Sequence, residues 1–96
     1  MIIKIEDRVV QALRHLQPDD AKKVNNVLSE LNDKTFAELR TDSNIHKLTG
    51  IKEQVFVLRA TSQLRILCKH RKDQSLLIED IVSHKGLEKF LDRRNK

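Results

Sequence analysis

The apolar positions in the first third of the chain follow helical spacing after a short strand-like start. Isoleucines at positions 2, 3 and 5 indicate a first strand of a few residues. Val9, Leu13 and Leu16 then recur every three or four residues, which predicts a helix over residues 6–16. Pro18 interrupts the pattern and suits the first turn of a second helix, because its fixed φ angle is already helical.

The second helix carries one apolar stripe, made of Ala21, Val24, Val27, Leu28 and Leu31. Asp19 and Asp20 lie in its first turn, where the helix dipole favours negative charge. Because so few residues separate the two helices, we expect an antiparallel helical hairpin. Thr35 and Glu38 then form the pattern of a capping box, which predicts a further short helical turn before a loop at residues 41–44.

The period of the pattern changes from Gln54 onward. Three runs rich in branched residues predict strands over residues 54–60, 64–71 and 75–83. Helical spacing then returns and predicts a short final helix that packs back on the sheet, with Leu87, Phe90 and Leu91 on its apolar face. The order of elements defines an α+β fold, in which an N-terminal strand and a helical hairpin pack on a small, mainly antiparallel sheet. A chain of 96 residues has the size of one domain, and we expect residues 1–96 to form it.

The parity of the strands decides which side chains share a face of the sheet. A three-residue loop, Thr61-Ser62-Gln63, between the first two of these strands places apolar residues opposite one another on one face. The resulting pairs are Ala60 with Leu64, Leu58 with Ile66, and Phe56 with Cys68. On the other face the same register sets Arg59 directly opposite Arg65, whereas a two-residue loop would place Arg59 among the core residues.

Positive charge is concentrated in this second half of the chain. Residues 1–44 hold seven Lys and Arg against eight Asp and Glu, whereas residues 45–96 hold twelve against six. No acidic residue lies between Glu53 and Asp73. The asymmetry indicates an anionic partner, either a nucleic acid or an acidic protein segment, and the simpler alternative is that the lysines and arginines only keep the protein in solution.

The Arg59–Arg65 pair predicts an anion-binding site. Like charges directly opposite each other across a ladder are unfavourable by about 0.2–1 kcal/mol, so a sheet selected for stability alone would avoid them. The alternative is that each arginine pairs with a carboxylate, such as Glu79 on the last strand.

Metal, disulfide and membrane functions find little support in the sequence. Cys68 is the single cysteine, so no internal disulfide forms and a reducing, cytoplasmic location is expected. Cys68 and His70 share a strand face, but a structural zinc site needs four ligands, and we predict no metal site. No apolar run approaches the ~20 residues that span a bilayer, and the acidic residues near the N-terminus lead us to expect no export signal.

Order and spacing give the chain a resemblance to a known family. The resemblance rests on the helical hairpin followed by His46-Lys47-Leu48-Thr49-Gly50, then by VFVLRATSQLRILCKH, and finally by IVSHKGLEKFL. This arrangement resembles the RelE/ParE superfamily, the toxins of bacterial type II toxin–antitoxin pairs, over nearly the whole chain. In that family a Lys-Leu-x-Gly lead-in precedes a strand that ends in Arg, a tight turn, and an Arg that opens the next strand.

The resemblance implies a toxin held inactive by a cognate antitoxin. RelE-type members cleave messenger RNA in the ribosomal A site, whereas ParE-type members act on DNA gyrase. Resemblance to the RelE-type members implies a cytoplasmic, cofactor-free and metal-independent endoribonuclease that blocks translation. Its partners would be the ribosome and messenger RNA. Position by position, Arg59 and Arg65 match the hairpin arginines of the family, and Lys85 matches the basic residue after the last strand, with His84 just before it.

Metal-free RNA cleavage needs a charge clamp on the phosphate and groups that move protons. Guanidinium forks match phosphate oxygens, so Arg59 and Arg65 are the candidate clamp. His84 is the candidate proton carrier, with Lys85 as its alternative and a structural role for the histidine as the other interpretation. Further RNA contacts are expected from the remaining basic residues Lys47, Lys69 and Arg71.

Two departures from the family pattern keep other functions open. RelE-type toxins often carry lysines where this chain has Val55 and Val57, and often a C-terminal tyrosine, which this chain lacks. No strong general acid or base is therefore obvious. The alternatives are a ParE-type inhibitor of DNA gyrase and a catalytically inactive relative that acts as a protein-binding module.

Overall fold

The computed structural model describes residues 1–49, 54–87 and 89. Its elements are, in chain order, β1 (Ile3–Ile5), α1 (Asp7–Arg14), α2 (Pro18–Asn32), α3 (Phe36–Arg40), β2 (Ile45–Lys47), β3 (Phe56–Arg59), β4 (Leu64–His70) and β5 (Leu76–Ser83). Among these residues no helix is long and apolar enough to cross a membrane.

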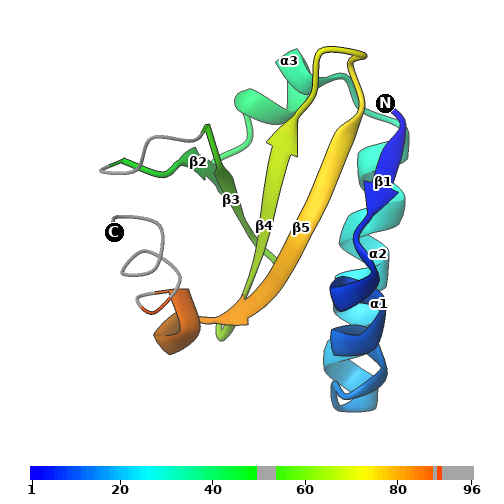
Figure 1. Ribbon diagram of the computed structural model, residues 1–96, viewed down its shortest axis with the longest axis vertical. Helices are drawn as coiled ribbons and strands as arrows, with labels where there is room; N and C mark the ends of the chain where they lie inside the picture. The colour runs from blue at the N-terminus through cyan, green and yellow to red at the C-terminus, as the bar shows by residue number, and fades with distance from the viewer. Residues whose placement is uncertain (50–53, 88, 90–96) are drawn as a thin grey trace.

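The described strands form one five-stranded sheet in the order β1-β5-β4-β3-β2 (Figure 1). The first strand runs parallel to β5, and the other neighbours are antiparallel. The predicted α+β class and the mainly antiparallel sheet are confirmed. The strand β2, which pairs with β3 at the edge of the sheet, was not predicted, because three residues are too few to show a period of two.

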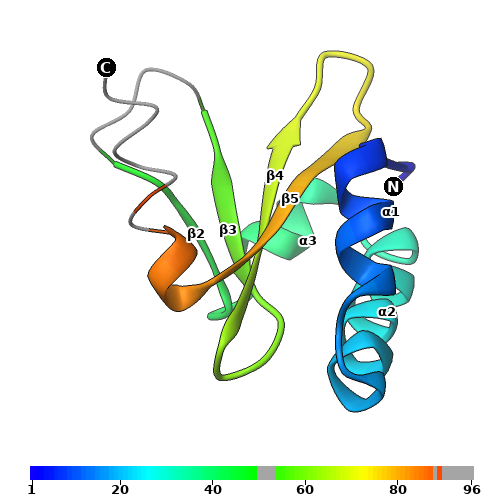
Figure 2. The same ribbon diagram turned by 60° about the horizontal axis from the view of Figure 1, so that its bottom comes forward.

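The helical hairpin of α1 and α2 covers one face of the sheet at its β1–β5 side (Figures 1 and 2). The first helix ends earlier than predicted, at Arg14, and the chain then closes a turn in which the N–H of Leu16 donates to the carbonyl of Leu13 at 3.4 Å. The second helix begins at Pro18, as predicted. The predicted capping box is present at α3, where the N–H of Glu38 donates to Thr35 Oγ1 at 3.1 Å.

The predicted register of the central hairpin is confirmed. Leu58 lies opposite Ile66, Phe56 opposite Cys68, and Arg59 opposite Arg65. The apolar face of this hairpin meets the helices in the main core, whose buried residues are Val9, Val24, Leu28, Leu31, Leu39, Ile45, Phe56, Leu58, Ile66, Cys68, Leu76, Ile78 and Ile81. Each fully buried aliphatic side chain of this set contributes about 1.5–3 kcal/mol, so the core fixes which face the arginines occupy.

The opposite face of the sheet, which carries Arg59 and Arg65, also holds apolar residues. A second apolar cluster lies there, formed by the buried residues Leu48, Val55, Val57 and Leu67. Val82 and Leu87 pack against this cluster and cover part of it. Apart from Lys69, the basic residues of β3 and β4 on this face therefore lie at the ends of the strands.

A short C-terminal helical segment follows β5 directly. His84 is its first helical residue, and the N–H of Gly86 donates to Ser83 Oγ at 2.9 Å, which is a side-chain cap at the start of a helix. Leu87 packs on the sheet as predicted. The predicted contributions of Phe90 and Leu91 lie outside the described residues.

Candidate functional site

Four of the predicted site residues meet at one end of the sheet, around the turn between β3 and β4. Arg59 and Arg65 are directly paired across the ladder. The N–H of His84 donates to the carbonyl of Gln63 in that turn at 2.9 Å, and Lys85 follows it. We refer to Arg59, Arg65, His84 and Lys85 as the basic end.

The two arginines of the basic end have different environments. Nη1 of Arg65 donates to the carbonyl oxygens of Thr61 at 2.8 Å and Leu64 at 3.0 Å, so this side chain fastens the turn. Arg59 is exposed, and within the described residues its side chain makes no hydrogen bond or ion pair. Arg59 is therefore the guanidinium that is available to an anion, and Arg65 is held beside it.

The carboxylates of β5 do not neutralise the arginines. Oε2 of Glu79, which is buried, lies 3.5 Å from Nζ of Lys69, so the alternative in which Glu79 pairs with Arg59 or Arg65 is wrong. A bulge in the β4–β5 ladder places Glu79 between Ile78, which pairs with Cys68, and Asp80, which pairs with Leu67. Oδ1 of Asp80 accepts the N–H of Ile81 at 2.9 Å.

The three predicted RNA contacts lie away from the basic end. Lys69 is engaged by Glu79 in the middle of the sheet. Arg71 follows the last residue of β4 and so belongs to the opposite end of that strand. Lys47 lies on β2 opposite Phe56, which places it on the helix-covered face, away from the face of Arg59 and Arg65.

His46 is a candidate that the sequence reasoning missed. It pairs with Val57 on β2, and alternation along the strand places it on the face of Arg59, with an exposed side chain. Leu48, two residues further on, lies in the second apolar cluster and confirms this facing. The signal was hidden because the sequence pattern did not reveal β2 as a strand.

Cys68 and His70 do not form a reactive or metal-binding pair. Cys68 is buried in the main core, and this burial raises the pKa of its thiol to about 12, which makes the thiolate inaccessible at neutral pH. The ring of His70 stacks on Phe36 with a centroid separation of 3.9 Å. Among the described residues no three His, Cys, Asp or Glu side chains come together in a way that would hold a metal ion.

The basic end can bind an oxyanion and supply protons to it. Two arginines on paired strand positions, with an imidazole and an ammonium group on the adjoining helical start, carry charge opposite to that of a phosphodiester. The exposed position also suits an acidic protein segment, because carboxylates bind the same forks.

Comparisons with known proteins identify the fold. Neither the protein-family models nor the curated proteins give a match to this sequence. Among solved structures, a chain of the archaeal RelE–RelB complex from Pyrococcus horikoshii OT3 is similar, with a TM-score of 0.67 and 20% identity over 85% of this chain and 92% of that one. A metal-bound toxin from Helicobacter pylori has a TM-score of 0.61 and 14% identity, over 91% of this chain and 98% of that one.

These similarities show that the chain has the RelE-like toxin fold, as the sequence resemblance predicted. The sequence identities are low, so the site residues are argued from their positions in this structure.

Proposed function

We propose that this protein is the toxin of a toxin–antitoxin pair and that it cleaves messenger RNA on the ribosome without a metal ion. The observation that carries this proposal is that Arg59 and Arg65 lie directly opposite each other in the β3–β4 register, although like charges repel. The likeness to a chain of the RelE–RelB complex supports an antitoxin partner. The cytoplasm is the compartment in which such a toxin meets ribosomes.

The chemistry assigns a role to each residue of the basic end. Arg59 binds the scissile phosphate and offsets the charge that develops in the transition state. Arg65 holds the turn and places its guanidinium beside that phosphate. His84 takes the proton of the 2′-hydroxyl or gives one to the leaving 5′-oxygen, and Lys85 adds positive charge.

The remaining predicted contacts have no part in the cleavage step. Lys69 is neutralised by Glu79, and Arg71 and Lys47 lie at another end and on another face. The ribosome and the messenger RNA are expected to meet the face that carries Arg59, Arg65 and His46.

Induction of the protein without its antitoxin tests the proposal. We expect growth arrest together with new messenger RNA ends at ribosome-bound codons, and a loss of about 100- to 1,000-fold in cleavage rate for Arg59→Ala. Arg8→Ala is the matched control, because Arg8 is an exposed arginine on α1. Intact transcripts in arrested cells would contradict the nuclease.

A ParE-type inhibitor of DNA gyrase is the second candidate. Val55 and Val57 are fully buried in the second apolar cluster, so the positions where RelE-type toxins often carry lysines offer no proton carrier here. An inhibitor that works by protein contact needs none. Growth arrest with intact transcripts and damaged DNA would favour it, and induction without any growth effect would favour a protein-binding module.

A further inference from the structure

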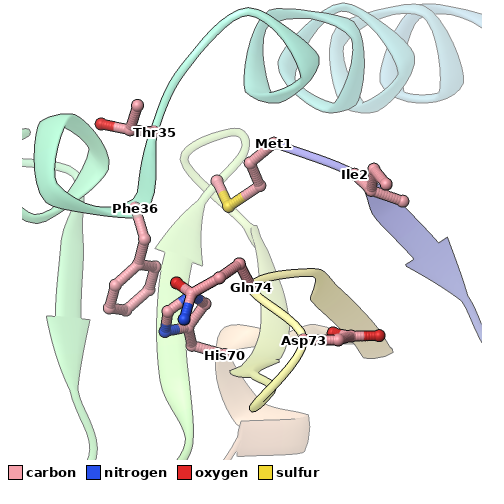
Figure 3. A pocket seen from close by; sticks show the side chains of 7 residues that line it. All are labelled: Met1, Ile2, Thr35, Phe36, His70, Asp73 and Gln74. Atoms are coloured by element: carbon pink, nitrogen blue, oxygen red, sulfur yellow. The ribbon is translucent and has the colours of Figure 1, made fainter.

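A pocket of about 360 Å³ opens at the other end of the sheet, beside the turn that joins β4 and β5. Its lining residues come from three stretches of the chain and are Met1, Ile2, Thr35, Phe36, His70, Asp73 and Gln74 (Figure 3). The volume falls at the lower end of the range in which proteins bind ligands, and it fits one large side chain.

One wall of this pocket is aromatic and firmly held. The rings of Phe36 and His70 stack almost in parallel, with an interplanar angle of 6°, and Phe56 meets Phe36 edge-on at 5.1 Å from behind. Nε2 of His70 is buried and has no hydrogen-bond partner among the described residues. A buried polar atom without a partner is unfavourable in the folded protein.

The rim of the pocket is apolar on one side. Ile2 lines the pocket, and 69% of its surface is exposed, the largest fraction among the exposed large apolar residues of the described chain. An isoleucine in that position gains stability when a partner covers it.

Positive charge lies next to the pocket, on the turn that follows β4. Asp73 is already engaged, because one carboxylate oxygen accepts from Ser75 and the other lies 2.9 Å from Nζ of Lys4. Arg71 and Lys72 on the same turn are exposed and form no ion pair with any described residue. With His70 and Asp73 they line a second hollow on that turn.

We propose that this β4–β5 pocket is a docking site for the antitoxin, and that it receives one large apolar side chain from an acidic segment. This inference rests on the proposed function, since it names the chemistry of the antitoxin segment. The apolar side chain fills the space between Ile2 and Phe36, and its acidic neighbours pair with Arg71 and Lys72.

Charge decides between this occupant and a second copy of the chain. The protein has a net charge of +5, so two copies repel each other, whereas an acidic segment is attracted to Arg71 and Lys72 beside the pocket. The pocket lies at the opposite end of β4 from Arg65, so the docked segment and the basic end are separate sites.

Affinity measurements with the purified product of the adjacent gene test the docking site. We expect Ile2→Glu to weaken binding at least tenfold in titration calorimetry, because it places a negative charge against an acidic segment. Val10→Glu is the matched control, since Val10 is an exposed apolar residue of α1 outside the pocket, and we expect it to bind as the unaltered protein does. Equal affinities of the two variants would overturn the proposal.

A double charge reversal tests the role of Arg71 and Lys72 beside the pocket. Arg71→Glu with Lys72→Glu is expected to weaken binding more at low salt than at high salt, whereas Lys22→Glu with Lys23→Glu on α2 makes the same change in net charge elsewhere. The ¹⁵N resonances of the His70 ring are expected to move in the complex. Equal effects of the two reversals, or unmoved ring resonances, would place the segment elsewhere.

A growth assay separates a failure of the proposed toxin function from a failure of the proposed docking site. Arrest by the unaltered protein tests the toxin, and the affinity series tests the pocket. A protein that arrests growth and binds the adjacent gene product without using the pocket would overturn only the docking site.

Discussion

The two ends of strand β4 show how one basic stretch of sequence gives two different surfaces. At the start of β4, Arg59 and Arg65 lie side by side, and no described carboxylate pairs with either. At its end, His70 is packed into an aromatic stack, and the only carboxylate of the following turn, Asp73, is held by Lys4 and Ser75. One end presents two opposed arginines, whereas the other combines an apolar pocket with exposed basic residues on the adjoining turn.

This difference teaches that the excess of positive charge in the second half of the chain does not form a single site. Lys69, between the two ends, is neutralised by Glu79. The apolar cluster around Leu67 separates the basic end from the turn that carries Arg71 and Lys72. A count of charges along the sequence therefore overstates the positive charge at each surface. It also hides that the basic residues form two separate surfaces.

The largest expected effect concerns the proton carrier at the basic end. If the protein is a nuclease, we expect His84→Ala to lower the single-turnover cleavage rate by about 100- to 10,000-fold and to remove one limb of its pH profile. His46→Ala, on the same face, is expected to cost less than about tenfold. A larger loss of cleavage rate for His46→Ala than for His84→Ala in rapid-quench measurements would assign the proton transfer to His46.

A second effect separates the two arginines that face each other. Arg65→Ala is expected to lower the free energy of unfolding by about 1–2 kcal/mol, because its bonds to the turn carbonyls are lost. Arg59→Ala should change it by less than about 0.5 kcal/mol. Urea denaturation of both variants measures the difference, and equal losses would mean that Arg65 does not fasten the turn.

A smaller effect is expected at the middle of the sheet. Glu79→Gln leaves Lys69 without its charged partner, and we expect a loss of about 1 kcal/mol, since Lys69 is 30% exposed and can reach water. Thermal unfolding followed by circular dichroism measures this loss. A variant of unchanged or higher stability would show that the pair serves something other than stability.

The smallest effect lies at the pocket end and depends on pH. Hydrogen bonds from Ser75 and Lys4 hold the pKa of Asp73 well below its usual range. Because the folded state lowers this pKa, the contribution of the carboxylate is fully present above its ordinary value of about 4, begins to fall below that value, and is lost only as the pH passes through the lowered pKa of the folded state. Asp73→Asn should therefore melt slightly lower at pH 7, and its difference from the unaltered protein should shrink steadily as the pH falls below about 4. A constant difference at all pH values would contradict this.

Local rules of side-chain direction made much of the fold predictable. The three-residue loop at residues 61–63 and the alternation of the strands were enough to give the register and the Arg59–Arg65 pair. The capping box gave the start of α3, because its two hydrogen bonds involve residues only three positions apart. The core face followed from the same alternation, and the burial of Cys68 confirms it.

The remaining features depend on contacts that the sequence pattern does not contain. The second apolar cluster joins Leu48 to Val55, Val57 and Leu67, and the facing of Leu48 follows only once β2 is known. The bulge at Glu79 shifts the β5 register, which gives this carboxylate to Lys69. The fastening of the turn by Arg65 depends on one rotamer of a long side chain, which no periodicity can indicate.

The parallel pairing of β1 with β5 has a consequence for how the chain folds as it is made. Ile3 and Ile5 pair with Leu76 and Ile78, so the first strand of the chain has no partner until more than seventy further residues have left the ribosome. Contacts so distant in sequence slow folding, because the loop that they close is long. Arg65 on β4 and His84 after β5, the two edges of the basic end, are likewise made long after the first strand. Under the proposed function, the nascent chain therefore stays inactive until β5 has been made, and a cell that makes this protein has that interval in which to supply a partner.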